Sequence, residues 1–109
     1  MIYIGNHVSV SDGYLAMGKE EASLGGNTFA FFTRNPRGGG SKDVPQSDID
    51  ALAAYLRENN FGKLVAHAPY TMNLCSDKED IRKFALDMLK DDLYIHSRST
   101  LYNLPYHML

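Results

Sequence analysis

The chain has little cysteine, no long apolar run and almost no net charge, and each of these absences excludes a class of protein. Its single cysteine, Cys75, excludes an internal disulfide and a zinc site built from several cysteines. No apolar run approaches the about 20 residues that cross a bilayer, and the N-terminus lacks the pattern of a signal peptide. A net charge of −2 argues against a globally basic nucleic-acid binder, so any DNA contact must rest on a local patch. We therefore expect a cytoplasmic protein without a membrane partner.

Predicted strands and helices alternate along the 109 residues, which form one domain at most. Apolar and β-branched runs predict strands at residues 2–4, 28–33, 63–67 and 100–104, the second of them buried on both faces. Helical spacing of apolar residues predicts three helices between them, one over 14–24 and two that begin at capping boxes, Ser47 with Asp50 and Ser76 with Glu79. The order βαβαβαβ predicts an α/β fold with parallel strands and helices outside the sheet, because such crossovers are right-handed.

Two histidines end predicted strands, at the edge where parallel α/β folds carry their chemistry. The apolar run before His67 stops at this residue, and its imidazole is a candidate metal ligand. The alternative is a hydrogen-bonded histidine at a strand end. His7 follows the first strand and so lies at the same edge, where it is a candidate to orient a metal ligand or to pack against the loop.

The segment from residue 34 to 42 concentrates positive charge on a chain that is acidic overall. It contains Arg34, Arg37 and Lys42 and no acidic residue. Basic loops of this kind contact phosphates without reading base sequence, although most basic loop residues simply face solvent.

Three segments of the chain resemble the endonuclease IV family of zinc-dependent apurinic/apyrimidinic endonucleases. They are residues 2–9, 27–37 and 67–74, in the family's order and at compatible spacing, and they cover roughly residues 1–90. The resemblance implies a partial TIM (β/α)8 barrel, since a whole barrel typically takes about 250 residues. We therefore expect residues 1–109 to form the N-terminal half of a xylose-isomerase-like TIM barrel, with a tail that diverges from about residue 95.

The resemblance also implies a function and assigns residues to it. The family repairs DNA by cleaving the phosphodiester 5′ to abasic sites in double-stranded DNA, with a trinuclear zinc cluster as cofactor. His67 matches a zinc ligand, and Arg37 and Tyr70 match residues that contact DNA around the extruded nucleotide. The chain departs from the family at Thr71, where relatives often carry a bulky apolar wedge. It departs again after residues 101–103, where the family's next liganding histidine is not matched, so no role is carried onto His107.

The remaining zinc ligands have no counterpart in these residues, so we expect a truncated and inactive form of the enzyme. Unpaired sheet edges predict a chain that self-associates or is marginally folded. Two alternatives stay open: a fragment of a TIM-barrel metalloenzyme of the sugar isomerase/epimerase type, and a non-catalytic fragment. The segments around Arg37 and Tyr70 favour the endonuclease, because in that family they belong to the DNA-binding face.

Overall fold

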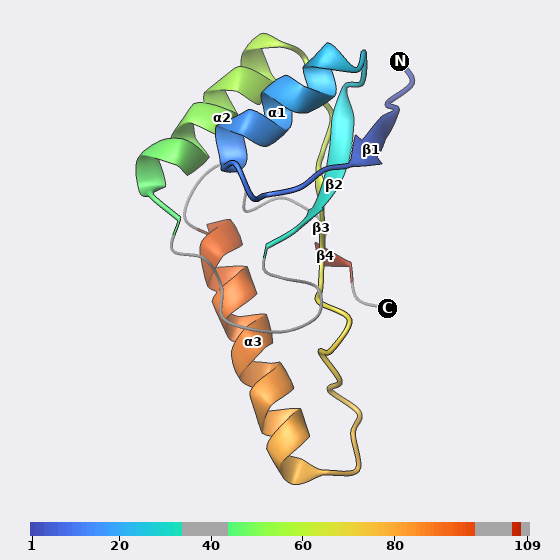
Figure 1. The fold of residues 1–109 in the computed structure, drawn as a ribbon, viewed down its shortest axis with the longest axis vertical. Coiled ribbons are helices and arrows are strands. Elements are labelled where there is room, and N and C mark those ends of the chain that lie inside the picture. The colour runs from blue at the N-terminus through green and yellow to red at the C-terminus, as the bar shows by residue number, and fades with distance from the viewer. Residues whose placement is uncertain (34–43, 98–105, 108–109) are drawn as a thin grey trace.

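Strands and helices alternate in the computed structural model, which describes residues 1–33, 44–97 and 106–107. The order is β1, α1, β2, α2, β3, α3, β4 (Figure 1). Strands span Gly5–His7, Thr28–Phe32, Val65–His67 and Tyr106–His107. Helices span Tyr14–Ser23, Gln46–Glu58 and Glu79–Ser97. The predicted βαβαβαβ order is therefore confirmed.

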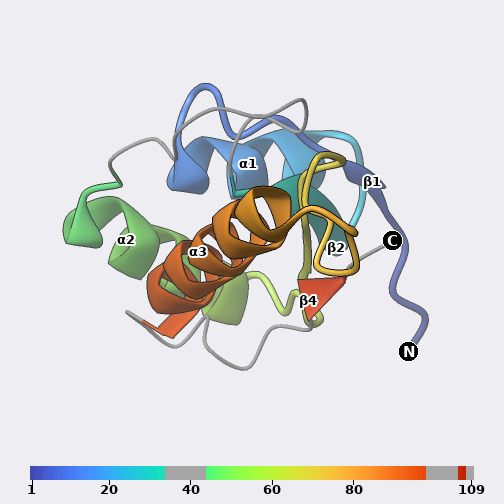
Figure 2. The ribbon, with the colours of Figure 1, turned by 90° about the horizontal axis from the view of Figure 1, so that it is seen from below.

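The four strands form one sheet in the order β1-β2-β3-β4, and every neighbouring pair is parallel. The three helices lie on one side of this sheet, as both views of the ribbon show (Figures 1 and 2). The register places His7 opposite Ala30 and Phe32 opposite His67. The carboxyl ends of β1, β2 and β3 therefore meet at one edge of the sheet.

The apolar core lies between the sheet and the helices α1 and α2. Its members alternate along each strand, so that Phe29 and Phe31 of β2 are buried whereas Ala30 and Phe32 are only half-buried. The prediction that residues 28–33 are buried on both faces is wrong, because helices cover only one face of β2 among the residues that the structure describes. Each large core side chain contributes about 1.5–3 kcal/mol. The largest are Tyr14, Met17, Phe29, Phe31, Ile49, Leu52 and Leu64.

The first strand begins three residues later than the sequence predicts, at Gly5 instead of Ile2. The side-chain amide of Asn27 binds the preceding residues: the Ile4 N–H donates to Asn27 Oδ1 at 2.8 Å, and Asn27 Nδ2 donates to the Ile2 carbonyl at 3.1 Å. Glycine is required where the strand begins, because a Cβ at Gly5 would lie 1.6 Å from the carbonyl oxygen of Thr28.

Helix starts also differ from the predicted capping boxes. Helix α2 begins at Gln46 with Pro45 as its N-cap, so the box of Ser47 with Asp50 is wrong. The Asp48 carboxylate instead accepts hydrogen bonds from the N–H groups of Tyr14 at 2.7 Å and Leu15 at 3.1 Å. It therefore caps the start of α1 from another helix. At α3, the Ser76 hydroxyl accepts from the N–H of Lys78 at 3.1 Å, one residue before the position that a capping box requires.

A buried carboxylate fixes the far end of α1. Glu21 is fully buried, and Asn6 Nδ2 donates a hydrogen bond to its Oε1 at 3.2 Å. A Cβ at Gly26 would lie 1.9 Å from the same oxygen, so glycine is needed to leave room for it. Helix α1 is thus fixed by polar contacts at both ends.

Two further expectations concern the end of the chain and the membrane. The predicted strand at 100–104 lies outside the described residues, and the last described strand, β4, covers Tyr106–His107. No helix within the described ranges is both long and apolar enough to cross a membrane.

Candidate metal and nucleic-acid site

The last residue of each of the first three strands has a side chain with a ring. The three ring side chains lie on the face of the sheet that points away from the helices. His7 ends β1, Phe32 ends β2 and His67 ends β3. In a parallel sheet, residues in register point to the same face, and successive residues alternate. The pairs His7 with Ala30 and Phe32 with His67 therefore place all three on the face opposite the buried Phe31. The expectation that both histidines lie at one edge is confirmed.

Phe32 lies at the centre of this cluster. Its ring centroid is 4.6 Å from that of His7, 4.8 Å from that of His67 and 5.3 Å from that of Tyr70. The His67 ring is 6.1 Å from Tyr70 and 6.4 Å from His7. All five distances lie in the range typical of aromatic pairs. The rim of the sheet therefore carries one connected group of rings.

The tautomer of His67 is set by the backbone. Its Nδ1 lies 2.6 Å from the carbonyl oxygen of Ala68. A carbonyl oxygen only accepts hydrogen bonds, so Nδ1 carries the proton, and in the neutral imidazole Nε2 is then the nitrogen with the lone pair that a metal ligand needs. Metal-binding histidines commonly use this same contact to fix their orientation.

His7 is biased toward the neutral form. Partial burial lowers the pKa of its imidazole below the ordinary value of 6.5, and the proximity of His67 lowers this pKa further. At neutral pH the His7 ring is therefore uncharged. A neutral imidazole has one nitrogen that donates a hydrogen bond and one that accepts it.

The described residues fit one zinc ligand but not a zinc cluster. A catalytic zinc takes three protein ligands. Within the ranges that the structure describes, no group of three or more His, Cys, Asp and Glu side chains is arranged to hold a metal ion. Cys75 is exposed in the segment between β3 and α3. The trinuclear cluster implied by the resemblance thus does not fit on these residues alone, whereas the geometry of His67 suits a single ligand.

Of the two predicted DNA contacts, the structure describes Tyr70 but not Arg37. Tyr70 lies in the loop after β3, and its side chain is 65% exposed beside the His67 ring. It is therefore accessible to a ligand that approaches the rim. Arg37 lies outside the described residues, as does the whole basic segment from 34 to 42.

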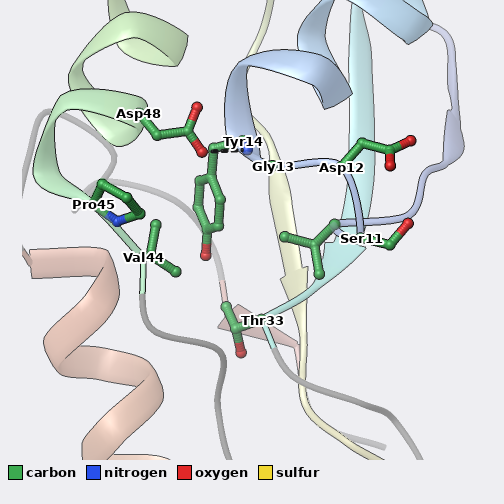
Figure 3. Close-up of a pocket in the computed structure, with 9 residues that line it drawn as sticks. Ser11, Asp12, Gly13, Tyr14, Thr33, Val44, Pro45 and Asp48 are labelled. Carbon is green, nitrogen blue, oxygen red and sulfur yellow. Dashed lines mark hydrogen bonds between the residues drawn. The ribbon is translucent and has the colours of Figure 1, made fainter.

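A cavity of about 200 Å³ lies between the start of α1, the start of α2 and the residue after β2, and sequence reasoning missed it (Figure 3). Figure 3 shows the Asp48 carboxylate turned toward the start of α1, with the Tyr14 ring extending from there toward Val44 and Thr33. The Asp12-Gly13 turn after the first strand was the available sequence signal. Asp48 already serves as a helix cap, so we assign no chemistry to the cavity. Its lining residues are Val10, Ser11, Asp12, Gly13, Tyr14, Thr33, Val44, Pro45 and Asp48.

Comparison with known proteins agrees with this architecture. The profile of the family described as xylose isomerase-like TIM barrel matches residues 19–97. The chain is 52% identical over 93 residues to "Probable endonuclease 4" of Clostridium beijerinckii, which is 85% of this chain and 34% of that protein. It is 49% identical over 105 residues to "Probable endonuclease 4" of Akkermansia muciniphila, which is 94% of this chain and 38% of that protein.

A solved structure gives the same result. The crystal structure of endonuclease IV from Thermus thermophilus matches with a TM-score of 0.74 and 26% identity, over 93% of this chain and 38% of that one. The chain spans about a third of the length of the curated relatives it matches. The predicted partial TIM barrel is thereby confirmed. The chain belongs to the xylose isomerase-like TIM barrel family and, within it, to the endonuclease IV family.

Proposed function

We propose that this chain supplies one zinc ligand and part of the DNA-facing rim of a DNA repair endonuclease. The reaction is zinc-assisted hydrolysis of the phosphodiester 5′ to an abasic site in double-stranded DNA. The observation that carries the proposal is His67 at the carboxyl end of β3, with its Nδ1 proton held by the Ala68 carbonyl and its ring beside the exposed Tyr70. The name endonuclease 4 of the relatives supports this proposal over the sugar isomerase/epimerase alternative.

Each residue contributes a physical property to this function. His67 presents Nε2 to zinc, which when bound would activate water and neutralise charge that develops on the phosphate. Tyr70 offers an exposed aromatic face that can fill the gap left in the base stack when the damaged nucleotide is extruded. Arg37 would contact phosphates, a role that rests on the sequence alone. His7, uncharged at neutral pH, would orient a metal ligand near His67.

We further propose that the 109-residue chain by itself does not cleave DNA. The described residues hold no group of three metal-binding side chains, whereas a catalytic zinc takes three protein ligands. The assignment of these residues to the N-terminal half of a barrel, with a divergent tail from about residue 95, stays a prediction. We also propose that the protein lies in the cytoplasm, where its DNA substrate is.

Self-association belongs to the same proposal. The segment before the edge strand β1 exposes large apolar side chains, with Met1 91%, Ile2 78% and Ile4 67% exposed. Apolar side chains beside an unpaired strand edge favour pairing with another chain. We therefore expect the purified chain to form oligomers as its concentration rises.

Binding of an abasic duplex tests the DNA assignment. The probe is a duplex with a tetrahydrofuran abasic analogue, and the comparison is the intact duplex of the same sequence. We expect the wild-type chain to prefer the abasic duplex and to leave both uncut. Tyr70→Ala should weaken binding of the abasic duplex about tenfold, because base–aromatic stacking contributes about 1–3 kcal/mol.

Tyr94→Ala is the matched control, since Tyr94 is a tyrosine of similar exposure, 67%, on α3. We expect this variant to bind the abasic duplex as the wild-type chain does. Equal affinity of the wild-type chain for abasic and intact duplexes, or equal losses in the two tyrosine variants, would contradict the proposal.

A further inference from the structure

We infer that Phe32 is a positioning residue that fixes the ring of His67 relative to the ring of Tyr70. The inference rests on the proposed function, in which His67 is a metal ligand and Tyr70 is an aromatic side chain that faces DNA. Sequence reasoning gave Phe32 no role beyond membership of a strand. The contacts that assign it one are its ring distances to His67, 4.8 Å, and to Tyr70, 5.3 Å.

Core packing does not account for Phe32. Phe29 and Phe31 point toward the helices, are 2% and 0% exposed, and belong to the buried core cluster. Phe32 points to the opposite face, is half-buried and lies outside that cluster. Among the described residues, its ring contacts are with His7, His67 and Tyr70, which are also the predicted site residues that the structure describes.

The sheet itself builds the contact between Phe32 and His67. The two residues are partners in the parallel register of β2 and β3, so their side chains leave the sheet side by side on one face. The rings meet edge to face, at 61° between their planes. The hydrogen bond from Nδ1 to Ala68 holds one edge of the imidazole, and Phe32 restricts the tilt of the ring about that bond.

The same ring reaches the loop that carries Tyr70. Phe32 and Tyr70 meet edge to face at 77°, and the Tyr70 side chain is otherwise largely exposed. A tyrosine on an exposed loop loses rotamer freedom when a rigid neighbour packs against it. Phe32 thus places the metal ligand and the DNA-facing ring in one fixed arrangement, as pre-organised sites require.

NMR of the full 109-residue chain tests this role with paired variants. Phe32→Leu removes the ring, Phe32→Tyr keeps it, and Phe29→Leu makes the same change on the opposite face of the same strand. The first readout is the set of nuclear Overhauser contacts between the rings of His67 and Tyr70 without metal. The second is the midpoint of a Zn²⁺ titration, followed at the ring protons of His67.

We expect Phe32→Leu to lose the contacts between the two rings and to raise the Zn²⁺ midpoint about tenfold, the lower end of the effect of removing a group that orients a metal ligand. Phe32→Tyr should restore both readouts. Phe29→Leu should lower the melting temperature and leave both readouts as in the wild-type chain. Phe32→Met, which keeps apolar volume without a ring, serves the same comparison if Phe32→Leu does not melt cooperatively.

The inference is overturned if the variants without a ring at position 32 keep the contacts between His67 and Tyr70, or if Phe29→Leu loses them to the same extent. The second result would show that Phe32 acts only through stability. A wild-type chain whose His67 signals do not respond to Zn²⁺ would contradict the proposed zinc function. The metal-free ring contacts would still decide the role of Phe32 in that case.

Discussion

Replacing Asp48 with alanine should destabilise the protein through a helix that does not contain it. The two oxygens of this carboxylate accept hydrogen bonds from the first N–H groups of α1, at Tyr14 and Leu15. Loss of a helix cap costs about 0.5–2 kcal/mol, and loss of a negative charge at a helix N-terminus costs about 0.3–1 kcal/mol more. Because both oxygens are used and both N–H groups lose their acceptor, we expect Asp48→Ala to cost about 2 kcal/mol.

The magnitude is large enough to measure by urea unfolding followed by far-ultraviolet circular dichroism. For a domain of this size a loss of about 2 kcal/mol corresponds to a fall in melting temperature of roughly 8–16 °C. Asp48→Asn should lie between wild type and Asp48→Ala, because one side-chain oxygen remains to accept.

Asp50→Ala is the matched control for this prediction. Asp50 lies on the same helix, is exposed and accepts a hydrogen bond from Gln46 Nε2 at 2.9 Å. We expect this variant to change the free energy of unfolding by no more than about 0.5 kcal/mol. If Asp48→Ala proves as stable as Asp50→Ala, the cross-helix cap does not stabilise α1 and the reasoning is wrong.

Three further predictions follow from other contacts. Gly26→Ala should lower the free energy of unfolding in urea by about 3 kcal/mol, because the new Cβ meets the buried Glu21 carboxylate. This value is at the upper end of the cost of overpacking a core. Gly25→Ala, where a Cβ has open space, should cost about 1 kcal/mol for its positive φ, and equal losses would refute the clash. The lowered pKa of His7 means that the unfolded chain binds its proton more tightly, so the stability from this residue is complete above pH 6.5 and is lost as pH falls toward the folded-state pKa. In the His7→Gln variant the free energy of unfolding should depend less on pH than in the wild-type chain. An equal pH dependence in the two chains would contradict the lowered pKa. Sedimentation at rising concentration should show self-association, and a monomer whose unfolding transition does not change with concentration would rule it out.

The order of elements was predictable because local signals agree with the final fold. The helix predicted over 14–24 is observed at Tyr14–Ser23, followed by Gly25 at a φ of 84°. The apolar run that ends at His67 was enough to predict a strand and a histidine at its carboxyl end. From parallel pairing alone it then follows that His7 and His67 share an edge.

The wrong predictions share a physical cause: contacts with residues far away in the sequence override the local preference of a segment. The Asn27 amide replaces strand partners for residues 2–4, so the first strand starts later than its apolar run. Asp48 lies in the first turn of α2, yet its carboxylate caps the start of α1. The central place of Phe32 depends on which face of β2 the helices cover, and a continuous aromatic run such as 28–33 carries no signal for that choice.

The dependence of α1 on Asp48 also affects when this helix can fold while the chain is synthesised on the ribosome. The carboxylate that completes the first turn of α1 lies 34 residues downstream of Tyr14. At about 5–20 residues per second, translation adds that stretch in roughly 2–7 s. During this interval the nascent β1 and α1 segments lack their cap, and they are therefore poor candidates for an autonomous folding nucleus. Amide hydrogens at Tyr14 and Leu15 should consequently exchange with solvent together with the opening of α2.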